Sequence, residues 1–260
     1  DSARDETGAL PIEGWAAQGV LPAMDRKQAQ VDPGESKPPA KFEMMDELAR
    51  GGVGAINRIR DKELRRTLVV KTLLDGNAAT DYVFKKFIEE AQITAQLEHP
   101  NIVPVHEFGY FSGGEVFFTM KQVQGRTLKE IIRGLRKCDP EISKSFPRLR
   151  LIRIFEQICM AIGFAHSRGV IHRDIKPSNV MVGDFGQTLV LDWGVAKVLG
   201  KNDDGEDSMN PVVTGRSESD DSTMVGLITG TPSYMAPEQA AGKTDLLDQR
   251  SDVYALGALL

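Results

Sequence analysis

The stretch His172-Arg173-Asp174-Ile175-Lys176-Pro177-Ser178-Asn179 decides how the rest of the chain is interpreted. It holds a carboxylate that can accept a proton, a lysine ammonium two positions later, and an asparagine whose side-chain oxygen can bind a cation. A second stretch, Asp192-Trp193-Gly194, directly follows an apolar run. Because carboxylate and amide oxygens are ligands that Mg²⁺ accepts, the two stretches together predict a site that combines a base with metal ligands.

Another triplet, Asp184-Phe185-Gly186, competes with Asp192 for the metal-binding role. It lies between two short apolar runs, Val180-Met181-Val182 and Leu189-Val190-Leu191. An Asp and a Gly between two such runs are typical of the turn of a β-hairpin. Asp192 comes eighteen residues after Asp174, at the end of the second run. We therefore expect Asp192, and not Asp184, in the site.

Composition narrows the class of protein. The chain of 260 residues can form one large domain or two small lobes, and 41% hydrophobic residues suffice for a core. A net charge of −5 without a long basic run does not favour nucleic acid or an anionic membrane as partner. Cys138 and Cys159 have no metal-binding spacing and fit a reducing cytosol.

The ends of the sequence indicate a fragment. No apolar run reaches the ~18 residues that span a bilayer, and no signal peptide is visible. The chain starts at Asp1 and stops at Leu260 inside an apolar run, so we expect truncation at one or both ends. A membrane anchor or a sensor module can then lie outside it.

Local patterns predict the order of elements. Residues 1–40 are rich in Pro, Gly, Ala and charge, which predicts a largely disordered linker, and residues 201–223 are polar enough to predict a mobile loop. We expect strands over 42–71 and 116–120, a short helix over 127–137 and a polar loop over 138–147. Helical spacing predicts one helix over 81–97, capped by Thr80, and a second helix ending near Ser167. Their apolar faces comprise Phe84, Phe87, Ile88, Ala91 and Ala95 in the first, and Leu151, Ile154, Phe155, Ile158, Cys159 and Ile162 in the second.

Two further signals lie near the start of the strands. The stretch from Leu48 to Ile56 is rich in glycine and can approach phosphates through backbone N–H groups, although a glycine-rich hairpin turn explains it equally well. Lys71 follows the apolar run Leu68-Val69-Val70, in which the two valines are β-branched; a lysine in that position is more often solvated than functional.

Near the C-terminus, two more stretches complete a family pattern: residues 230–238, Gly-Thr-Pro-Ser-Tyr-Met-Ala-Pro-Glu, and residues 251–257, Ser-Asp-Val-Tyr-Ala-Leu-Gly. From about Phe42 to Leu260, the motifs and their order resemble eukaryotic-like bacterial serine/threonine protein kinases. The resemblance implies an α+β bilobal fold. It has a β-rich N-lobe with one helix over 41–120, a hinge over 121–125, and a mostly helical, incomplete C-lobe over 126–260.

The resemblance also assigns roles to residues. Asp174 is the base, Lys176 contacts the transferred phosphate, and Asn179 and Asp192 bind Mg²⁺. Lys71 holds the α/β-phosphates and pairs with a helix glutamate. Of Glu89 and Glu90 we choose Glu90, which lies nine residues before His99 as in the family, and expect Glu89 to face solvent. The ATP-binding residues are then Ala49, Gly51, Gly52, Gly54, Ile56, Lys71, Met120, and, through their backbones, Lys121 and Val123.

Regulatory and supporting roles follow from the same resemblance. Arg173 can clamp a phosphate on the activation loop, for which Ser222, Thr223 and Thr229 are the candidate sites, and solvated hydroxyls are the alternative. Thr231 is expected to hydrogen-bond Asp174 and Lys176. Asp252 is expected to bind the backbone of the catalytic loop.

The chain departs from the family at several positions. Ala49 replaces a glycine and Ile56 a valine, and the alanine can stiffen the loop and weaken nucleotide binding. Trp193 replaces the usual phenylalanine and needs more room under the helix. The arginine that pairs with Glu238 in the family lies beyond Leu260, so we expect Glu238 to lack this partner and the second lobe's core to be incomplete.

The predicted function is transfer of the ATP γ-phosphate to protein Ser or Thr hydroxyls, with Mg²⁺, by a cytoplasmic catalytic domain in signalling. Lys176 and the stretch 230–232 favour Ser/Thr over Tyr. The alternatives are a pseudokinase that acts as a binding or scaffold module, and a small-molecule phosphotransferase of related fold. The presence of Lys71, Glu90, Asp174, Asn179 and Asp192 argues against the first, and the peptide-docking segment 230–238 against the second.

Overall fold

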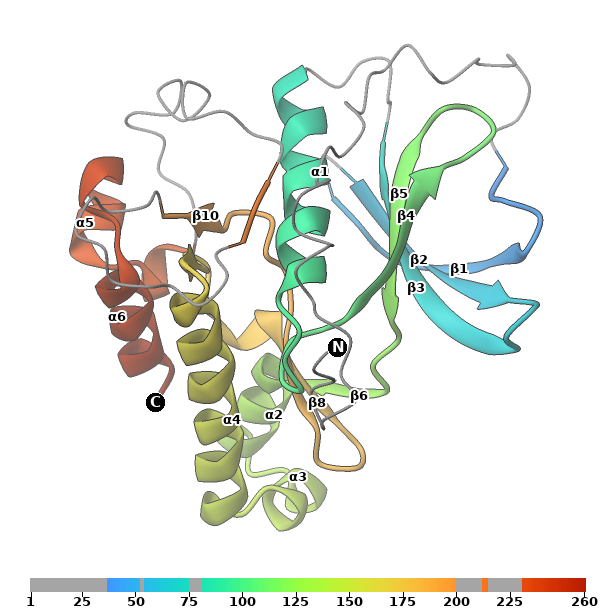
Figure 1. Ribbon diagram of the computed structural model, residues 1–260. Helices are drawn as coiled ribbons and strands as arrows, with labels where there is room; N and C mark the ends of the chain where they lie inside the picture. The colour runs from blue at the N-terminus through green and yellow to red at the C-terminus, as the bar shows by residue number, and fades with distance from the viewer. Residues whose placement is uncertain (1–36, 52–53, 75–80, 200–211, 215–230) are drawn as a thin grey trace, which may run out of the picture.

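The computed structural model describes residues 37–51, 54–74, 81–199, 212–214 and 231–260. Figure 1 shows a sheet on one side of the molecule, helices on the other, and helix α1 between them. The predicted linker falls outside the described residues except for 37–40, and the predicted cap Thr80 falls outside them as well. Hydrogen bonds between Lys37 and Ser112 fasten the first described residues to the sheet.

The small lobe is built on an antiparallel sheet with strand order β1-β2-β3-β5-β4. Alternation along the strands gives the sheet two apolar faces. Leu68 and Val70 of β3 pack on one face with Phe42 and Ile59, and Phe118 of β5 packs on the other face beneath α1. The strands are β1 (Phe42–Arg50), β2 (Gly54–Asp61), β3 (Arg66–Leu73), β4 (Val105–Tyr110) and β5 (Val116–Lys121).

Helix α1 (Asp81–Gln96) belongs to two cores. Its middle residues Phe87 and Ala91 pack with the small-lobe strands. Ile93, near its end, and Leu97, just beyond it, belong instead to the core of the large lobe. The apolar face therefore differs from the predicted one at its C-terminal end, where Ala95 is exposed and Ile93 is buried.

Helix α4 (Arg148–Ser167) is the centre of the large lobe and forms where predicted. Ile154, Ile158 and Ile162 are buried on its inner face, and Gly169, with φ of +72°, follows its end. The other large-lobe helices are α2 (Leu128–Arg136), α3 (Pro140–Ser145), α5 (Pro237–Ala240) and α6 (Gln249–Leu259). The large lobe also contains the short strands β6 (Gly125–Thr127), β7 (Val170–Ile171), β8 (Val180–Gly183), β9 (Thr188–Val190) and β10 (Lys197–Val198).

Helix α3 corrects the predicted polar loop over 138–147. The Asp139 side chain accepts hydrogen bonds from the backbone N–H groups of Glu141 and Ile142, and Pro140 occupies the first helical turn. These are the N-terminal signals of a helix. The burial of Ile142 and Phe146 attaches α3 to the large-lobe core, so this six-residue helix is stable despite its polar composition.

The triplet Asp184-Phe185-Gly186 forms the turn of a hairpin between β8 and β9, as predicted. Gly183 N–H donates to Gln187 O at 2.8 Å, Gly186 has φ of +84°, and Phe185 is 99% exposed. A short loop with a left-handed residue is a common hairpin connection. All three residues of the triplet are exposed, and none of them lines the cavity that Asp192 lines.

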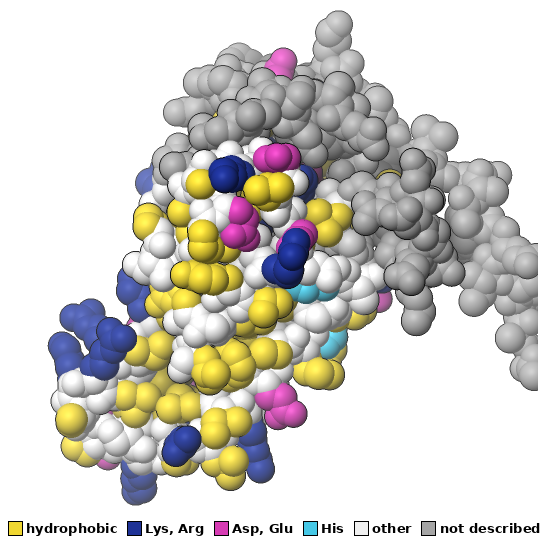
Figure 2. Space-filling view, turned by 90° about the vertical axis from the view of Figure 1, so that its left-hand side faces the viewer, with side chains coloured by type: hydrophobic (Ala, Val, Ile, Leu, Met, Phe, Trp, Pro, Cys, Tyr) yellow, Lys and Arg dark blue, Asp and Glu magenta, His cyan; other side chains and the backbone are white. Residues whose placement is uncertain are grey.

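Hydrophobic side chains also gather on one outer side of the large lobe (Figure 2). The exposed hydrophobic residues of α4 and α6 are Leu149, Ile152, Met160, Val253 and Tyr254.

No helix among the described residues is long and apolar enough to cross a membrane. The sheet-rich lobe with one helix and the helical lobe together form the predicted α+β bilobal fold.

Candidate active site

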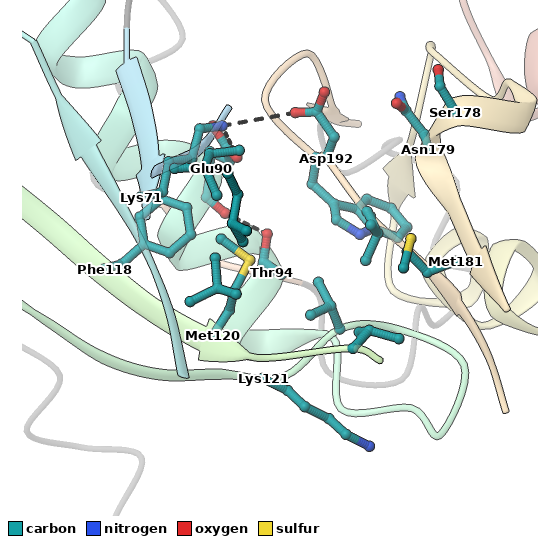
Figure 3. Close-up of a pocket in the computed structure, with 17 residues that line it drawn as sticks. Lys71, Glu90, Thr94, Phe118, Met120, Lys121, Ser178, Asn179, Met181 and Asp192 are labelled. Carbon is teal, nitrogen blue, oxygen red and sulfur yellow. Dashed lines mark hydrogen bonds and ion pairs between the residues drawn. The ribbon is translucent and has the colours of Figure 1, made fainter. Parts of the chain in front are cut away.

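A cavity of about 330 Å³ lies between the small-lobe sheet with α1 on one side and residues 178–193 of the large lobe on the other. Figure 3 shows Lys71, Glu90, Phe118 and Met120 on one side of it and Asn179, Met181 and Asp192 on the other. Its size is within the range of small-molecule sites. The lining residues are Leu48, Ile56, Val69, Lys71, Glu90, Thr94, Val103, Phe118, Met120, Lys121, Val123, Ser178, Asn179, Met181, Leu191, Asp192 and Trp193.

Lys71 and Glu90 form an ion pair across the small lobe. Lys71 stands on β3, Glu90 on α1, and their Nζ and Oε1 atoms are 2.5 Å apart. The Lys71 Nζ atom also lies 3.8 Å from Oδ1 of Asp192, a contact drawn in Figure 3. One ammonium therefore faces a carboxylate from each side of the cavity.

Burial and charge compete in this pair. Burial disfavours the Lys71 ammonium, but the carboxylates of Glu90 and Asp192 outweigh burial and raise the pKa of Lys71. Burial also raises the pKa of the Glu90 carboxyl, against the attraction of Lys71, and the charge of Asp192 adds to that rise. Lys71 is thus held as a cation, and Glu90 depends on Lys71 to remain ionised.

Gly194 lets the chain pass directly under Glu90. A Cβ atom at residue 194 would lie 2.9 Å from Oε2 of Glu90. That distance is shorter than van der Waals contact, so a larger residue would displace the carboxylate that holds Lys71. The third residue of the stretch Asp192-Trp193-Gly194 is therefore small for a steric reason.

The expectation for Glu89 is wrong in one respect. Glu90 is the partner of Lys71, as chosen, but Glu89 does not face solvent, since both residues are 8% exposed. The Glu89 carboxylate contacts Lys86 Nζ at 2.7 Å. The ion pair with Lys86, on the same helix as Glu89, offsets the cost of burying this carboxylate.

Asp174 lies at the centre of a polar cluster beside the cavity. Its Oδ2 atom accepts hydrogen bonds from Lys176 Nζ at 2.6 Å and from Asn179 Nδ2 at 3.1 Å. Its Oδ1 atom accepts one from the Thr231 hydroxyl at 3.0 Å. These donors fix the orientation of a side chain that is only 10% exposed.

The backbone of the catalytic stretch is fastened from below. Asp252, on α6, accepts hydrogen bonds from the backbone N–H groups of His172 at 2.8 Å and Arg173 at 2.9 Å, and contacts His166 Nε2 at 2.8 Å. His172 is fully buried: its Nδ1 accepts from Asp174 N–H, so its Nε2 donates to Leu191 O at 3.1 Å. These bonds connect the catalytic stretch to α6 and to Leu191, the residue before Asp192.

Asn179 and Asp192 provide a donor set that fits Mg²⁺. Asn179 uses its amide hydrogens on Asp174 O and Oδ2, which leaves the carboxamide oxygen for a cation. The Asp192 side chain is 52% exposed and lines the cavity. Mg²⁺ is usually held by one or two carboxylates together with substrate phosphates and water, so two hard oxygen ligands are sufficient. The described residues contain no cluster of three or more His, Cys, Asp or Glu that could hold a metal alone.

Both ends of the site carry backbone strain. Arg173 has φ of +66° and Asp192 φ of +60°, a region that non-glycine residues rarely occupy. Each such residue costs about 1–3 kcal/mol and is held there by its surroundings. Arg65 and Cys138, outside the site, also have positive φ, so the site is not the only strained part of the described chain.

Trp193, which was expected to need more room than the usual phenylalanine, is accommodated in the core. It is 1% exposed, and its ring centroid lies 4.6 Å from that of His172. Its indole Nε1 is buried without a hydrogen-bond partner among the described residues. The larger ring therefore packs well, but it leaves one donor unsatisfied.

The glycine-rich stretch connects β1 and β2 above the cavity. Gly51 N–H donates to Gly54 O at 2.9 Å, and Ile56 lines the cavity, while Gly52 lies outside the described residues. A Cβ atom at residue 54 would lie 2.7 Å from Thr72 O, so Gly54 is required for strand packing. Ala49 pairs with Ile56 and has no positive φ, so its backbone does not require glycine.

The predicted hinge begins inside a strand, because β5 extends to Lys121. The backbone N–H of Lys121 already donates to Pro104 O at 3.2 Å. A ligand contact through the Lys121 backbone must then use its carbonyl oxygen. Met120, Lys121 and Val123 all line the cavity, where the expected adenine contacts would be made.

The predicted regulatory residues are described only in part. The Arg173 guanidinium donates to Val195 O at 2.6 Å and to Ala196 O at 3.4 Å, so it holds the chain that follows Gly194. Ser222, Thr223 and Thr229 lie outside the described residues. Their roles and the phosphate clamp stay predictions.

Glu238 has a hydrogen-bond partner other than the arginine of the family. The Ser251 hydroxyl at the start of α6 donates to Glu238 Oε1 at 2.6 Å. Gln239, the next residue, donates from Nε2 to Arg173 O at 2.6 Å. Neither contact was foreseen, because no pattern in the sequence links residues 238 and 239 to partners so distant in the chain.

Comparison with known proteins agrees with this geometry. A model of the protein kinase domain family matches residues 42–260. Serine/threonine-protein kinase PknD of Protochlamydia amoebophila is 33% identical over 224 residues, which cover 84% of this chain and 22% of the relative. The protein of the same name is 32% identical over 226 residues in Chlamydia pneumoniae (85% and 23% covered) and 33% identical over 229 residues in Chlamydia trachomatis serovar L2b (85% and 24%).

The chain spans less than a quarter of the length of these curated relatives. The match itself is extensive, because the family model covers both lobes from the first residue of β1 to the last residue of the chain. The chain therefore belongs to the protein kinase domain family, and the predicted resemblance to bacterial serine/threonine kinases is confirmed.

Proposed function

We propose that this chain is a catalytic domain that transfers the γ-phosphoryl group of ATP to Ser or Thr hydroxyls of proteins. The observation that carries the proposal is the convergence of the Lys71–Glu90 pair, Asn179 and Asp192 on one cavity, with Asp174 hydrogen-bonded to Asn179 beside it. The curated relatives bear the name of serine/threonine-protein kinases, which supports the same activity.

The chemistry needs a base and positive charge close together. In the proposed reaction the acceptor oxygen forms a bond to the γ-phosphorus, the bond to the bridging oxygen of ADP breaks, and Asp174 takes the hydroxyl proton. Lys176, whose Nζ lies 2.6 Å from Asp174, supplies positive charge for the transferred group. Mg²⁺ bound by Asn179 and Asp192 would neutralise charge on the nucleotide phosphates.

The rest of the cavity suits a nucleotide. Val69, Met120 and Leu191 provide apolar lining for a flat base, and the residues after Met120 offer backbone groups at its edge. Lys71 is placed to bind the α/β-phosphates, since Glu90 and Asp192 hold its ammonium inside the cavity. The glycine-rich stretch from Ala49 to Ile56 is proposed to cover the phosphates.

Two contacts prepare the base for an acceptor hydroxyl, and the serine/threonine-protein kinase name of the curated relatives favours Ser or Thr as the acceptor. Thr231 hydrogen-bonds Asp174 at 3.0 Å and so holds the segment 231–238 beside the base. Lys176 contacts the other oxygen of the same carboxylate, so a serine or threonine hydroxyl that reaches Asp174 also meets a positive charge. A cytoplasmic location is also part of the proposal. It is consistent with the free thiols of Cys138 and Cys159, with protein acceptors and with the use of ATP.

Phosphoryl transfer tests the proposal directly. The chain is incubated with γ-labelled ATP, Mg²⁺ and dephosphorylated casein, beside Asp174→Asn and Asp192→Asn variants. We expect label on Ser and Thr only, and a loss of about 100-fold or more in Asp174→Asn, the usual contribution of a general base. Equal labelling by the chain and by Asp192→Asn would contradict metal-assisted transfer. Nucleotide binding without any labelling would favour the pseudokinase alternative.

A further inference from the structure

One valine of the polar stretch after Gly194 is packed into the large-lobe core. Val212 is 3% exposed and belongs to the same core cluster as Ile93 and Leu97. Its backbone N–H donates to Arg168 O at 3.2 Å. A valine in a stretch otherwise dense in charge and hydroxyls thus has a fixed place at the end of α4.

The next residue is bound by the last residue of α1. The Gln96 carboxamide donates from Nε2 to Val213 O at 2.7 Å and accepts at Oε1 from Val213 N–H at 3.0 Å. Nε2 also donates to Gln92 O at 2.9 Å, which orients the carboxamide. Val213 is 64% exposed, so Gln96 recognises the backbone and not the side chain.

These contacts connect the segment to Glu90. Gln96 and Glu90 stand on the same helix, about 9 Å apart along its axis at the usual rise. Figure 1 shows residues 212–214 beside the lower half of α1. Because a helix moves as a unit over such a distance, fixing Gln96 restricts the displacement of Glu90 relative to Lys71.

We propose that Gln96, Val212 and Val213 form a clasp that positions α1 so that Glu90 stays paired with Lys71. Gln96 is then a positioning residue for the proposed kinase reaction, on which this inference rests. The clasp joins the chain that leaves the metal-binding turn to the helix that carries Glu90. Its partner is backbone, so it needs no phosphate on the segment.

Matched variants separate the clasp from general packing. Gln96→Met keeps side-chain length and helix propensity but removes both hydrogen bonds to the Val213 backbone, together with the bond to Gln92 O. Ala95→Met places the same side chain on the adjacent exposed position as a control. Val213→Pro removes the N–H that Gln96 accepts, whereas Val213→Ala keeps it. Val213 has no positive φ, so neither change is excluded by a left-handed backbone.

The affinity for Mg·ADP, measured by calorimetry on the whole chain, reports how Lys71 is held. We expect Gln96→Met and Val213→Pro each to weaken ADP binding about fivefold, the size of one neutral hydrogen bond, and the two controls to stay within about twofold. The double variant should be no weaker than either single variant. In a Lys71→Met background, Gln96→Met should change nothing further, because the pair is already absent. A full additional loss in that background, or unchanged ADP binding in Gln96→Met, would overturn the proposal.

Hydrogen exchange keeps the test independent of the proposed function. If the chain binds no ADP, the proposed function fails, and the exchange of the amides of residues 91–96 decides about the clasp. About fivefold faster exchange there in Gln96→Met and Val213→Pro, with β3 unchanged, supports it. Unchanged exchange in α1 refutes it.

Discussion

The Oδ1 atom of Asp252 accepts a hydrogen bond from the backbone N–H of Arg173 at 2.9 Å, and Arg173 has φ of +66°. A carboxylate on α6 thereby holds the strained residue that precedes the base Asp174. Its other oxygen accepts from His172 N–H, so both oxygens are used. The catalytic stretch owes its conformation to a side chain eighty residues later in the sequence.

Asp252→Asn should destabilise the fold. The asparagine side chain would present one NH₂ group where two oxygens now accept, which leaves one buried N–H without a partner. We expect the free energy of unfolding to fall by about 1–3 kcal/mol in chemical denaturation. Asp245→Asn, at an exposed position, is the control and should change it by less than about 0.5 kcal/mol. Equal stability of the Asp252→Asn variant would show that these bonds contribute little.

Gly194→Ala should weaken nucleotide binding. The new methyl would lie 2.9 Å from Oε2 of Glu90, so the carboxylate must shift, and its Oε1 atom, which contacts Lys71, shifts with it. We expect about a tenfold loss of Mg·ADP affinity by calorimetry, since a charged hydrogen bond contributes about 1.5–3 kcal/mol. The spectroscopic fold and the exchange of α4 amides should stay as they are. Wild-type affinity in Gly194→Ala would mean that the carboxylate tolerates the methyl.

Gly163→Ala should stabilise the protein. Gly163 lies inside α4, and a Cβ added there meets no atom within 4 Å. Replacing a glycine by alanine in an open helical position removes conformational freedom of the unfolded chain, for a gain of about 0.5–1 kcal/mol. A rise in Tm of a few degrees measures it. A lower Tm would indicate that this face of α4 is covered by something that the described residues do not include.

The capping box of α2 should make stability depend on pH. The Glu130 carboxylate accepts hydrogen bonds from the backbone N–H of Thr127 and, with a smaller effect, from the Thr127 hydroxyl. Both lower the pKa of Glu130 below its ordinary value. A lowered folded-state pKa contributes stability above the unfolded pKa and loses it as pH falls through the folded pKa. The chain should therefore be more stable than Glu130→Gln near pH 7, and the difference should shrink on acidification below pH about 4.3. A difference independent of pH would contradict the role of the charge.

Much of the site could be predicted because its residues are close in the sequence or sit at fixed places in local patterns. Asp174, Lys176 and Asn179 share one stretch, and the hairpin at Asp184 follows from turn chemistry. Glu90 was separable from Glu89 only by family spacing. Its contact with Lys71 at 2.5 Å is explained by the way α1 packs on β3 and β5.

Contacts between distant segments could not be predicted. Gln96 with Val213, Ser251 with Glu238, and Gln239 with the backbone of Arg173 use polar residues that occur anywhere on a surface. Helix α3 was missed for another reason. Its six residues are too few to show the helical spacing of apolar residues, and two prolines favoured a loop over the capping signal at Asp139. Burial of Glu89 depends on Lys86, whose partner only the packed helix reveals.

The division of α1 between two cores has a consequence for motion between the lobes. Ile93 and Leu97 are anchored with α4, whereas Phe87 and Ala91 follow the sheet. When the cleft opens, the helix must swivel about its C-terminal end, so displacement grows toward Asp81. Glu90 lies closer to the anchored end of the helix than Asp81 does. The Glu90–Lys71 ion pair can therefore persist while the outer edge of the sheet moves much farther.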